Sequence, residues 1–137
     1  KIMNSQKKAK AGDIISDERR ISSDLIKSFG DISDDKNPIH FDNEFAGKTL
    51  FKKRIAHGLL SVSYISALLT KLLGDGNVIL SLGFDIKAPV YVDDIIVLKL
   101  EVTKINRNKT IELEFRINNK LSELLLIKGT IRCIKVY

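Results

Sequence analysis

Hydrophobic and polar residues alternate along the second half of the chain, in four separate stretches. Residues 78–88, 96–103 and 111–117 place an apolar side chain at nearly every second position, and residues 124–136 form a last mixed run. Successive side chains of a strand point to opposite faces, so this alternation predicts strands with one buried face. Because aspartate and asparagine pairs separate the runs, we expect turns between them and an antiparallel meander.

Residues 55–73 carry a different pattern, in which apolar residues recur at helical spacing over most of the circumference. The other positions are mostly small, as at Gly58, Ser63 and Ser66, and Gly74 favours an end to the helix. A helix that is apolar nearly all round must be buried. We therefore expect an α+β domain in which an antiparallel sheet wraps around a central buried helix, an arrangement known as the hot-dog fold.

The first part of the chain predicts a basic, polar segment over residues 1–12, ahead of a single domain over residues 13–137. Residues 13–21 alternate weakly, which favours a short strand. Serines at positions 22 and 23 supply hydroxyl groups of the kind that cap a helix start, and apolar residues follow at helical spacing as far as Ile32. A length of 137 residues fits one such domain.

Composition narrows the class of protein without identifying it. Hydrophobic residues make up 44% of the chain and charged residues 29%, which is typical of a globular protein. The single cysteine, Cys133, has no partner for an internal disulfide or a zinc site, so we expect a cytoplasmic protein. No apolar stretch reaches the ~20 residues of a membrane-spanning helix, so we expect no membrane association.

An excess of cations, 23 Lys and Arg against 17 Asp and Glu, gives a formal net charge of +6. Nucleic-acid-binding proteins often have such a balance, but these cations are scattered and lack the interleaved aromatic residues of a stacking surface. We therefore expect no nucleic-acid partner. The charge fits the attraction of an anionic small molecule or an acidic carrier protein better.

Residues 33–49 form a polar, turn-rich segment in which Pro38 breaks any helix. Asp35 and His40 would point about 140° apart on a helix, but in a loop bent at Pro38 both can face one pocket. A carboxylate and an imidazole that converge on one water form a proton-transfer pair. The alternative is a turn in which Asp35 and Asn37 cap backbone groups, and the spacing alone favours this turn.

Residues 56–58, Ala-His-Gly, lie at the start of the predicted buried helix. A helix start has free amide groups and a partial positive charge. Gly58 has no side chain, so a ligand oxygen can approach its amide closely, which suits an oxyanion or a polarised carbonyl. A glycine required only for tight packing explains the residue equally well.

Together these two segments resemble the MaoC-like family of (R)-specific enoyl-CoA hydratases. The family pattern is Asp-x-Asn-Pro-(Ile or Leu)-His-x-Asp, followed by an apolar residue, His and Gly at the buried helix. Residues 35–42 read Asp-Lys-Asn-Pro-Ile-His-Phe-Asp, and residues 56–58 supply the second part. The resemblance extends from about Asp13 to the C-terminus. It departs from the family at Asp34, where glycine is common, and this adds a like charge beside the first aspartate.

The resemblance implies an (R)-specific enoyl-CoA hydratase, equally a 3-hydroxyacyl thioester dehydratase, that needs no cofactor and no metal. Asp35 and His40 would be the catalytic pair that holds a water against a trans-2-enoyl thioester. The amide of Gly58 would polarise the thioester carbonyl. The substrate would be carried on CoA or on acyl carrier protein, and the enzyme would be a homodimer.

Three further residues are implied at or near the site. Asn37 would shape the loop, and His57 would make a structural hydrogen bond beside the amide donor. Ser66 lies where the family tends to keep a serine near the site, unless it bonds its own helix carbonyl. Residues 52–54, Lys-Lys-Arg, are expected either at the pocket mouth near the phosphates of CoA or in a solvated loop.

Other functions remain open beside this one. Hot-dog thioesterases and the main carrier-protein dehydratases commonly use an acidic residue on the central helix, and residues 57–73 contain neither Asp nor Glu. A non-catalytic acyl-CoA-binding module is a further alternative, although such a module would not need both Asp35 and His40.

Overall fold

The structure is a computed structural model that describes residues 8–136, so residues 1–7 of the expected basic segment lie outside the described part. Within it the elements follow in the order β1 (Ile14–Arg20), α1 (Ser23–Ser33), the 3-10 turn η1 (Pro38–His40), α2 (Asn43–Gly47), α3 (Gly58–Leu73), β2 (Asn77–Ile86), β3 (Ile95–Ile105), β4 (Thr110–Asn119) and β5 (Leu125–Lys135). No helix among the described residues combines the length and the apolar character needed to cross a bilayer.

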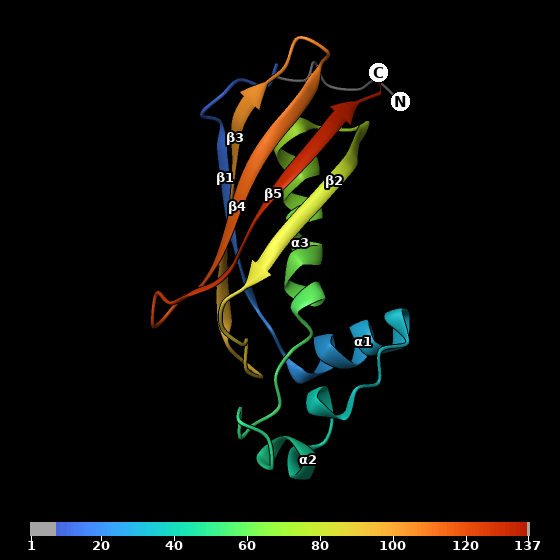
Figure 1. Cartoon of the computed structure of the whole chain (residues 1–137), viewed down its shortest axis with the longest axis vertical. Coiled ribbons are helices and arrows are strands. Elements are labelled where there is room, and N and C mark those ends of the chain that lie inside the picture. Colours follow the sequence, from blue (N-terminus) through green and yellow to red (C-terminus); the bar gives the residue numbers. More distant parts are fainter. Residues whose placement is uncertain (1–7, 137) are drawn as a thin grey trace.

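The strands form one antiparallel sheet in the order β1-β3-β4-β5-β2. Figure 1 shows α3 running along one face of this curved sheet, with α1 and α2 gathered at the end where α3 begins. β3, β4 and β5 form the predicted meander, but β2 pairs with β5 at the far edge instead of with β3. The segment between β2 and β3 crosses the start of α3, where the Ala56 N–H donates to the Val90 carbonyl at 2.8 Å. The sheet and its helix confirm the hot-dog fold.

The core lies between α3 and the sheet. Buried apolar side chains of β3 and β4 face the buried side chains of α3, which are Leu60, Val62, Ile65, Leu68, Leu69 and Leu73. Full burial of one such side chain stabilises the folded state by about 1.5–3 kcal/mol. This packing fixes α3 along the sheet and therefore fixes the position of its first turn.

The opposite face of α3 is open in the single chain. Its exposed residues follow one another at helical spacing and are Leu59, Ser63, Ser66, Ala67, Thr70 and Lys71. Several apolar residues of β2, the neighbouring edge strand, are exposed as well. The expected burial of the helix all round is therefore not reached within one chain, because the sheet covers only one side of it.

α3 begins at Gly58, three residues later than the apolar pattern predicted. Ile55 instead forms an isolated β-bridge with Tyr91, and Ala56 bonds the Val90 carbonyl. These two residues are extended because backbone pairing with the segment after β2 replaces the helical hydrogen bonds they would otherwise make. The correction matters for the site, since it makes the Gly58 amide the first of the helix.

The region before α3 is more regular than its polar sequence predicted. The expected helix start is confirmed, since the Ser22 Oγ accepts the Leu25 N–H at 3.2 Å at the beginning of α1. Residues 33–49, however, contain η1 and α2 rather than an irregular loop. Asn37 caps η1 and Asp42 caps α2 through their side chains, so local capping stabilises turns that have no apolar periodicity.

Candidate active site

A sharp turn after α1 carries Asp35 toward the start of α3. Asp34 ends α1 with a φ of 62° and a ψ of 18°, in the left-handed region that favours glycine. The Asp35 Oδ1 accepts the Asn37 N–H at 3.2 Å, so the capping turn that the spacing favoured is present. This turn still leaves a carboxylate oxygen of Asp35 within 4.8 Å of ring nitrogens of both His40 and His57.

The His40 ring is buried and its orientation is fixed by the backbone. Only 8% of the residue is exposed, and its Nδ1 lies 2.7 Å from the Ile55 carbonyl oxygen. A carbonyl oxygen can only accept, so Nδ1 carries the hydrogen and the Nε2 of the neutral ring keeps a lone pair. Burial lowers the pKa of His40, and repulsion from His57 adds to this, while the Ile55 hydrogen bond and Asp35 oppose it.

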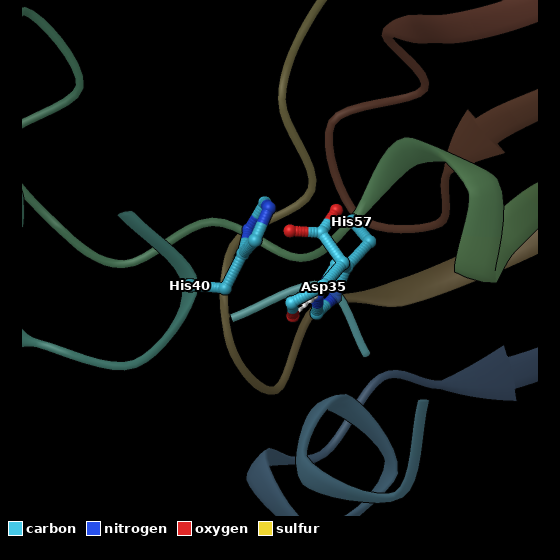
Figure 2. A group of neighbouring side chains, drawn as sticks. All are labelled: Asp35, His40 and His57. Atoms are coloured by element: carbon cyan, nitrogen blue, oxygen red, sulfur yellow. Dashed lines mark hydrogen bonds between the residues drawn. The ribbon is translucent and has the colours of Figure 1, made fainter. Parts of the chain in front are cut away.

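His57 stacks directly on His40. The two ring centroids are 3.8 Å apart and the planes differ by 28°. The Nε2 of His57 donates to the Asp35 backbone carbonyl at 3.2 Å, which is the dashed contact in Figure 2. His57 therefore ties the turn that carries the carboxylate to the ring that lies beside it.

Aromatic side chains from two segments close around His57. The ring of Phe29 on α1 lies 5.0 Å from the His57 ring, and that of Phe41 lies 5.6 Å from it, both measured between centroids. Only 3% of His57 is exposed, and its Nδ1 is buried without a hydrogen-bond partner among the described residues.

Two histidines and a carboxylate are also a common set of metal ligands, so the chemistry of this cluster has to be decided by its geometry. Each ring already donates one N–H to a backbone carbonyl. The remaining lone pairs lie in ring planes that are stacked and differ by 28°, so they do not converge on one point near both rings. The arrangement suits proton transfer between Asp35 and His40 better than it suits a metal ion.

A pocket lies at the N-terminus of α3, beside His40. The pocket has a volume of about 260 Å³, and its lining includes His40, Gly58, Ile86 and Ile127. A Cβ placed on Gly58 would lie 2.5 Å from the Cδ1 of Ile86. Glycine at this position therefore serves packing and leaves the first amide of the helix open to the pocket, so both readings of the residue stay compatible with the structure.

Ser63 and Ser66 of α3 lie on its exposed side. Ser63 donates to the Leu60 carbonyl at 2.6 Å, as expected for a serine inside a helix. Ser66 is eight positions after Gly58, or about 12 Å along the axis, and lies on the open face. The structure of one chain does not bring Ser66 to Asp35 and His40.

The three cations before α3 do not line the pocket beside His40, so of the two places expected for them the structure favours the loop outside it. Residues 52–54 lie instead along a separate hollow beside Tyr91. Lys53 places its Nζ 4.4 Å from the centre of the Tyr91 ring, and Arg54 donates hydrogen bonds to the His40 carbonyl and to Ser23. The cation that does line the pocket is Lys87.

Sequence reasoning did not single out Phe51, Ile86, Lys87 or Ile127 as pocket residues, although all four line the pocket. They come from separate segments, and only the pairing of β2 with β5 and the crossing after β2 bring them together. The Ala-His-Gly motif was a local signal for Gly58, whereas no local signal marks residues that meet through the sheet.

Comparison with known proteins gives the same picture. Residues 6–123 match the family described as MaoC like domain. The chain is 36% identical over 121 residues to an (R)-specific enoyl-CoA hydratase of Rhodospirillum rubrum, covering 88% of this chain and 83% of that protein. It is 43% identical over 89 residues to a 3-hydroxybutyryl-CoA dehydratase of Methylorubrum extorquens, covering 64% of this chain and only 57% of that protein.

The fold similarity extends over almost the whole chain. The solved structure of an (R)-hydratase from A. caviae has a TM-score of 0.88 and 30% identity, and the match covers 97% of this chain and 99% of that one. The family match, the sequence relatives and the shared fold agree with the loop motif and with the helix start described above. The chain therefore belongs to the MaoC-like domain family.

Proposed function

We propose that this protein is an (R)-specific enoyl-CoA hydratase, a hydro-lyase that adds water reversibly across the double bond of a trans-2-enoyl thioester. One observation carries the proposal. A carboxylate oxygen of Asp35 lies within 4.8 Å of a nitrogen of the buried His40 ring, and His40 and Gly58, the first residue of α3, line the same pocket. The relatives named as hydratase and dehydratase support the same reaction.

In this proposal Asp35 and His40 act on a single water molecule. One of them accepts a proton as the water oxygen bonds to the β-carbon, and the electron pair of the C=C bond moves to the α-carbon and the thioester carbonyl. The proton taken from the water then passes through the pair to the α-carbon, so both groups finish in the states in which they began. We assign the two transfers to the pair and not to either residue alone. The Nε2 of neutral His40 is the ring atom that takes part.

The Gly58 amide stabilises the charge that develops on the thioester oxygen. It is the first amide of α3, so no helical hydrogen bond uses it, and the helix dipole places partial positive charge there. Donors of this kind are most effective where the oxygen gains charge in the transition state. The anionic carrier of the acyl group approaches past Lys87, which lines the same pocket. The carrier is CoA or acyl carrier protein in this proposal.

The direct test is hydration of crotonyl-CoA, followed by the loss of enoyl thioester absorbance and by chiral analysis of the product. The proposal expects the (R)-3-hydroxy product and release of no free CoA. Binding of the thioester without turnover would support the non-catalytic acyl-CoA-binding alternative. Release of free thiol would support the thioesterase alternative, which the lack of an acidic residue on α3 disfavours.

We also propose that the protein forms a homodimer through β2 and the open face of α3. β2 is an edge strand with one partner, β5, and its outward residues Leu80 and Leu82 are exposed. Unpaired edges and contiguous apolar surface are normally covered in stable proteins. A two-fold arrangement would pair the same surface with itself, which meets both needs at once.

The proposal includes a cytoplasmic location. Cys133 is a free thiol, and it is buried in the sheet. Burial raises the pKa of this thiol, so it is kept in its unreactive protonated form. Fractionation of cells that express the tagged protein tests the location, and recovery outside the cytoplasmic fraction would contradict it.

A further inference from the structure

Arg54 joins two distant parts of the chain through its guanidinium group. Its Nε donates to the backbone carbonyl oxygen of His40 at 2.8 Å, and its Nη2 donates to the Ser23 Oγ at 3.1 Å. Ser23 is the first residue of α1, whereas His40 ends the turn η1. A guanidinium group is planar and holds its donors in a fixed fork, so it can fix one of these segments relative to the other.

The hydrogen bond from Arg54 is one of three that hold the turn η1 against the segment before α3. The Ile55 N–H donates to the Ile39 carbonyl at 3.3 Å, and the His40 Nδ1 lies 2.7 Å from the Ile55 carbonyl. The first of these bonds uses the backbone alone, and the second uses the catalytic ring itself. The bond from Arg54 is therefore the one that a side-chain substitution removes without altering His40.

We propose that Arg54 is a positioning residue that holds the His40 backbone where the reaction needs it, an inference that rests on the proposed function. Arg54 does not line the pocket, whereas His40, whose carbonyl it bonds, does. Proton transfer requires heavy atoms about 2.6–3.2 Å apart. A displacement of the ring by about 1 Å can slow a reaction ~100-fold. Loss of Arg54 therefore lowers kcat and leaves KM nearly unchanged.

The test compares Arg54→Met with Lys53→Met. Both remove one positive charge from adjacent positions, but the Lys53 ammonium lies over Tyr91, whereas the hydrogen bond to the His40 carbonyl comes from Arg54. For Arg54→Met we expect kcat with crotonyl-CoA to fall at least ~10-fold, KM to change less than ~2-fold and the salt dependence of KM to stay as in the wild type. Added ethylguanidinium should restore part of kcat. Lys53→Met should keep the wild-type kcat.

Two results for Arg54→Met would overturn the inference. A wild-type kcat would show that the bond to His40 is not needed. A raised KM that loses its salt dependence would assign Arg54 to the anionic carrier instead. If Arg54→Met does not fold, Ser23→Ala replaces it. This variant removes only the acceptor of the Arg54 Nη2 hydrogen bond. This variant should lower kcat by about 2–5-fold at unchanged KM, and an unchanged kcat would again overturn the inference.

A spectroscopic measurement separates this inference from the proposed function. A wild-type protein that hydrates no enoyl thioester would refute the function but leave the positioning testable. In ¹⁵N spectra of the histidine rings, the Nδ1 resonance of His40 should shift or broaden in Arg54→Met and stay unchanged in Lys53→Met. An unchanged His40 resonance in Arg54→Met would reject the positioning role, whatever the activity.

Discussion

Asp35 and His40 are the residues on which the proposed chemistry depends most. Asp35→Asn and His40→Ala should each lower kcat for crotonyl-CoA hydration by at least ~100-fold, the usual loss for a positioned acid or base. The double variant should be barely slower than either single one, because both groups act on one water. Steady-state kinetics with circular dichroism as the folding control measures this. Near wild-type rates in both single variants would refute the catalytic pair and favour the non-catalytic acyl-CoA-binding module.

His40 also makes folding depend on pH. Its pKa is lowered by burial from the ordinary 6.5, so the folded protein binds this proton less readily than the unfolded chain does. The free energy of unfolding should therefore fall as the pH drops from 7.5 to 5. His40→Asn keeps a donor for the Ile55 carbonyl but does not titrate, so its profile should be flatter. Urea denaturation at both pH values measures the free energy of unfolding of each protein. An equal change with pH in the wild type and in His40→Asn would contradict this prediction.

The Asp31 carboxyl group does not contribute in this pH window. Lys36 and Lys27 lower the pKa of Asp31 below its ordinary 3.8 through hydrogen bonds and charge. Its stabilising effect is present above pH 3.8 and is lost only as the pH falls through the lowered value. The comparison between pH 7.5 and 5 therefore avoids the titration of Asp31.

Asp34 departs from the family pattern at a position whose backbone conformation favours the family's glycine. Its φ of 62° is the conformation that glycine adopts most easily. Asp34→Gly should keep kcat and raise the free energy of unfolding by up to about 1 kcal/mol. Asp34→Ala, the matched control, should lower it. Chemical denaturation checks both, and an Asp34→Gly variant as inactive as Asp35→Asn would mean that the wrong aspartate was assigned.

At the scale of the element, the start of α3 can be tested for its two possible roles. Gly58→Ala adds a methyl group that meets the Cδ1 of Ile86, a flexible end on a residue that is 55% exposed. The fold should tolerate this, but the methyl group hinders approach to the amide, so kcat should fall ~10-fold or more. Adding Ile86→Ala restores the space. If the double variant recovers full activity, Gly58 serves packing only and its amide has no catalytic role.

At the scale of the whole molecule, the open surface predicts a dimer. Light scattering at micromolar concentration should give twice the chain mass. Leu82→Lys on β2, or Ala67→Glu on the open face of α3, should shift the protein to the monomer, because each buries an unpaired charge in the proposed interface. Leu121→Lys is the matched control, since Leu121 is 88% exposed on the β4–β5 turn. A monomeric wild type, or a monomer produced by the control, would contradict the interface.

Local patterns by themselves determined much of this molecule. The alternating runs predicted β2 to β5, the serine at position 22 predicted the start of α1, and the spacing around Pro38 predicted a bent turn with Asp35 and His40 on it. Each of these follows from a short-range rule, such as the period of a strand, the free amides of a helix start or the fixed ring of proline. The first turn of α3 was predicted too early, because the apolar period does not record a competing β-bridge.

Only the tertiary structure decided how these pieces meet. The stack of His40 on His57, the place of β2 beside β5 and the bond from Arg54 to the His40 carbonyl all join residues that are not neighbours in the chain. Such contacts depend on how α3 packs on the sheet and on which segments cross its first turn. A one-dimensional pattern has no period that encodes them, because the distance between two segments is set by packing and not by their separation along the sequence.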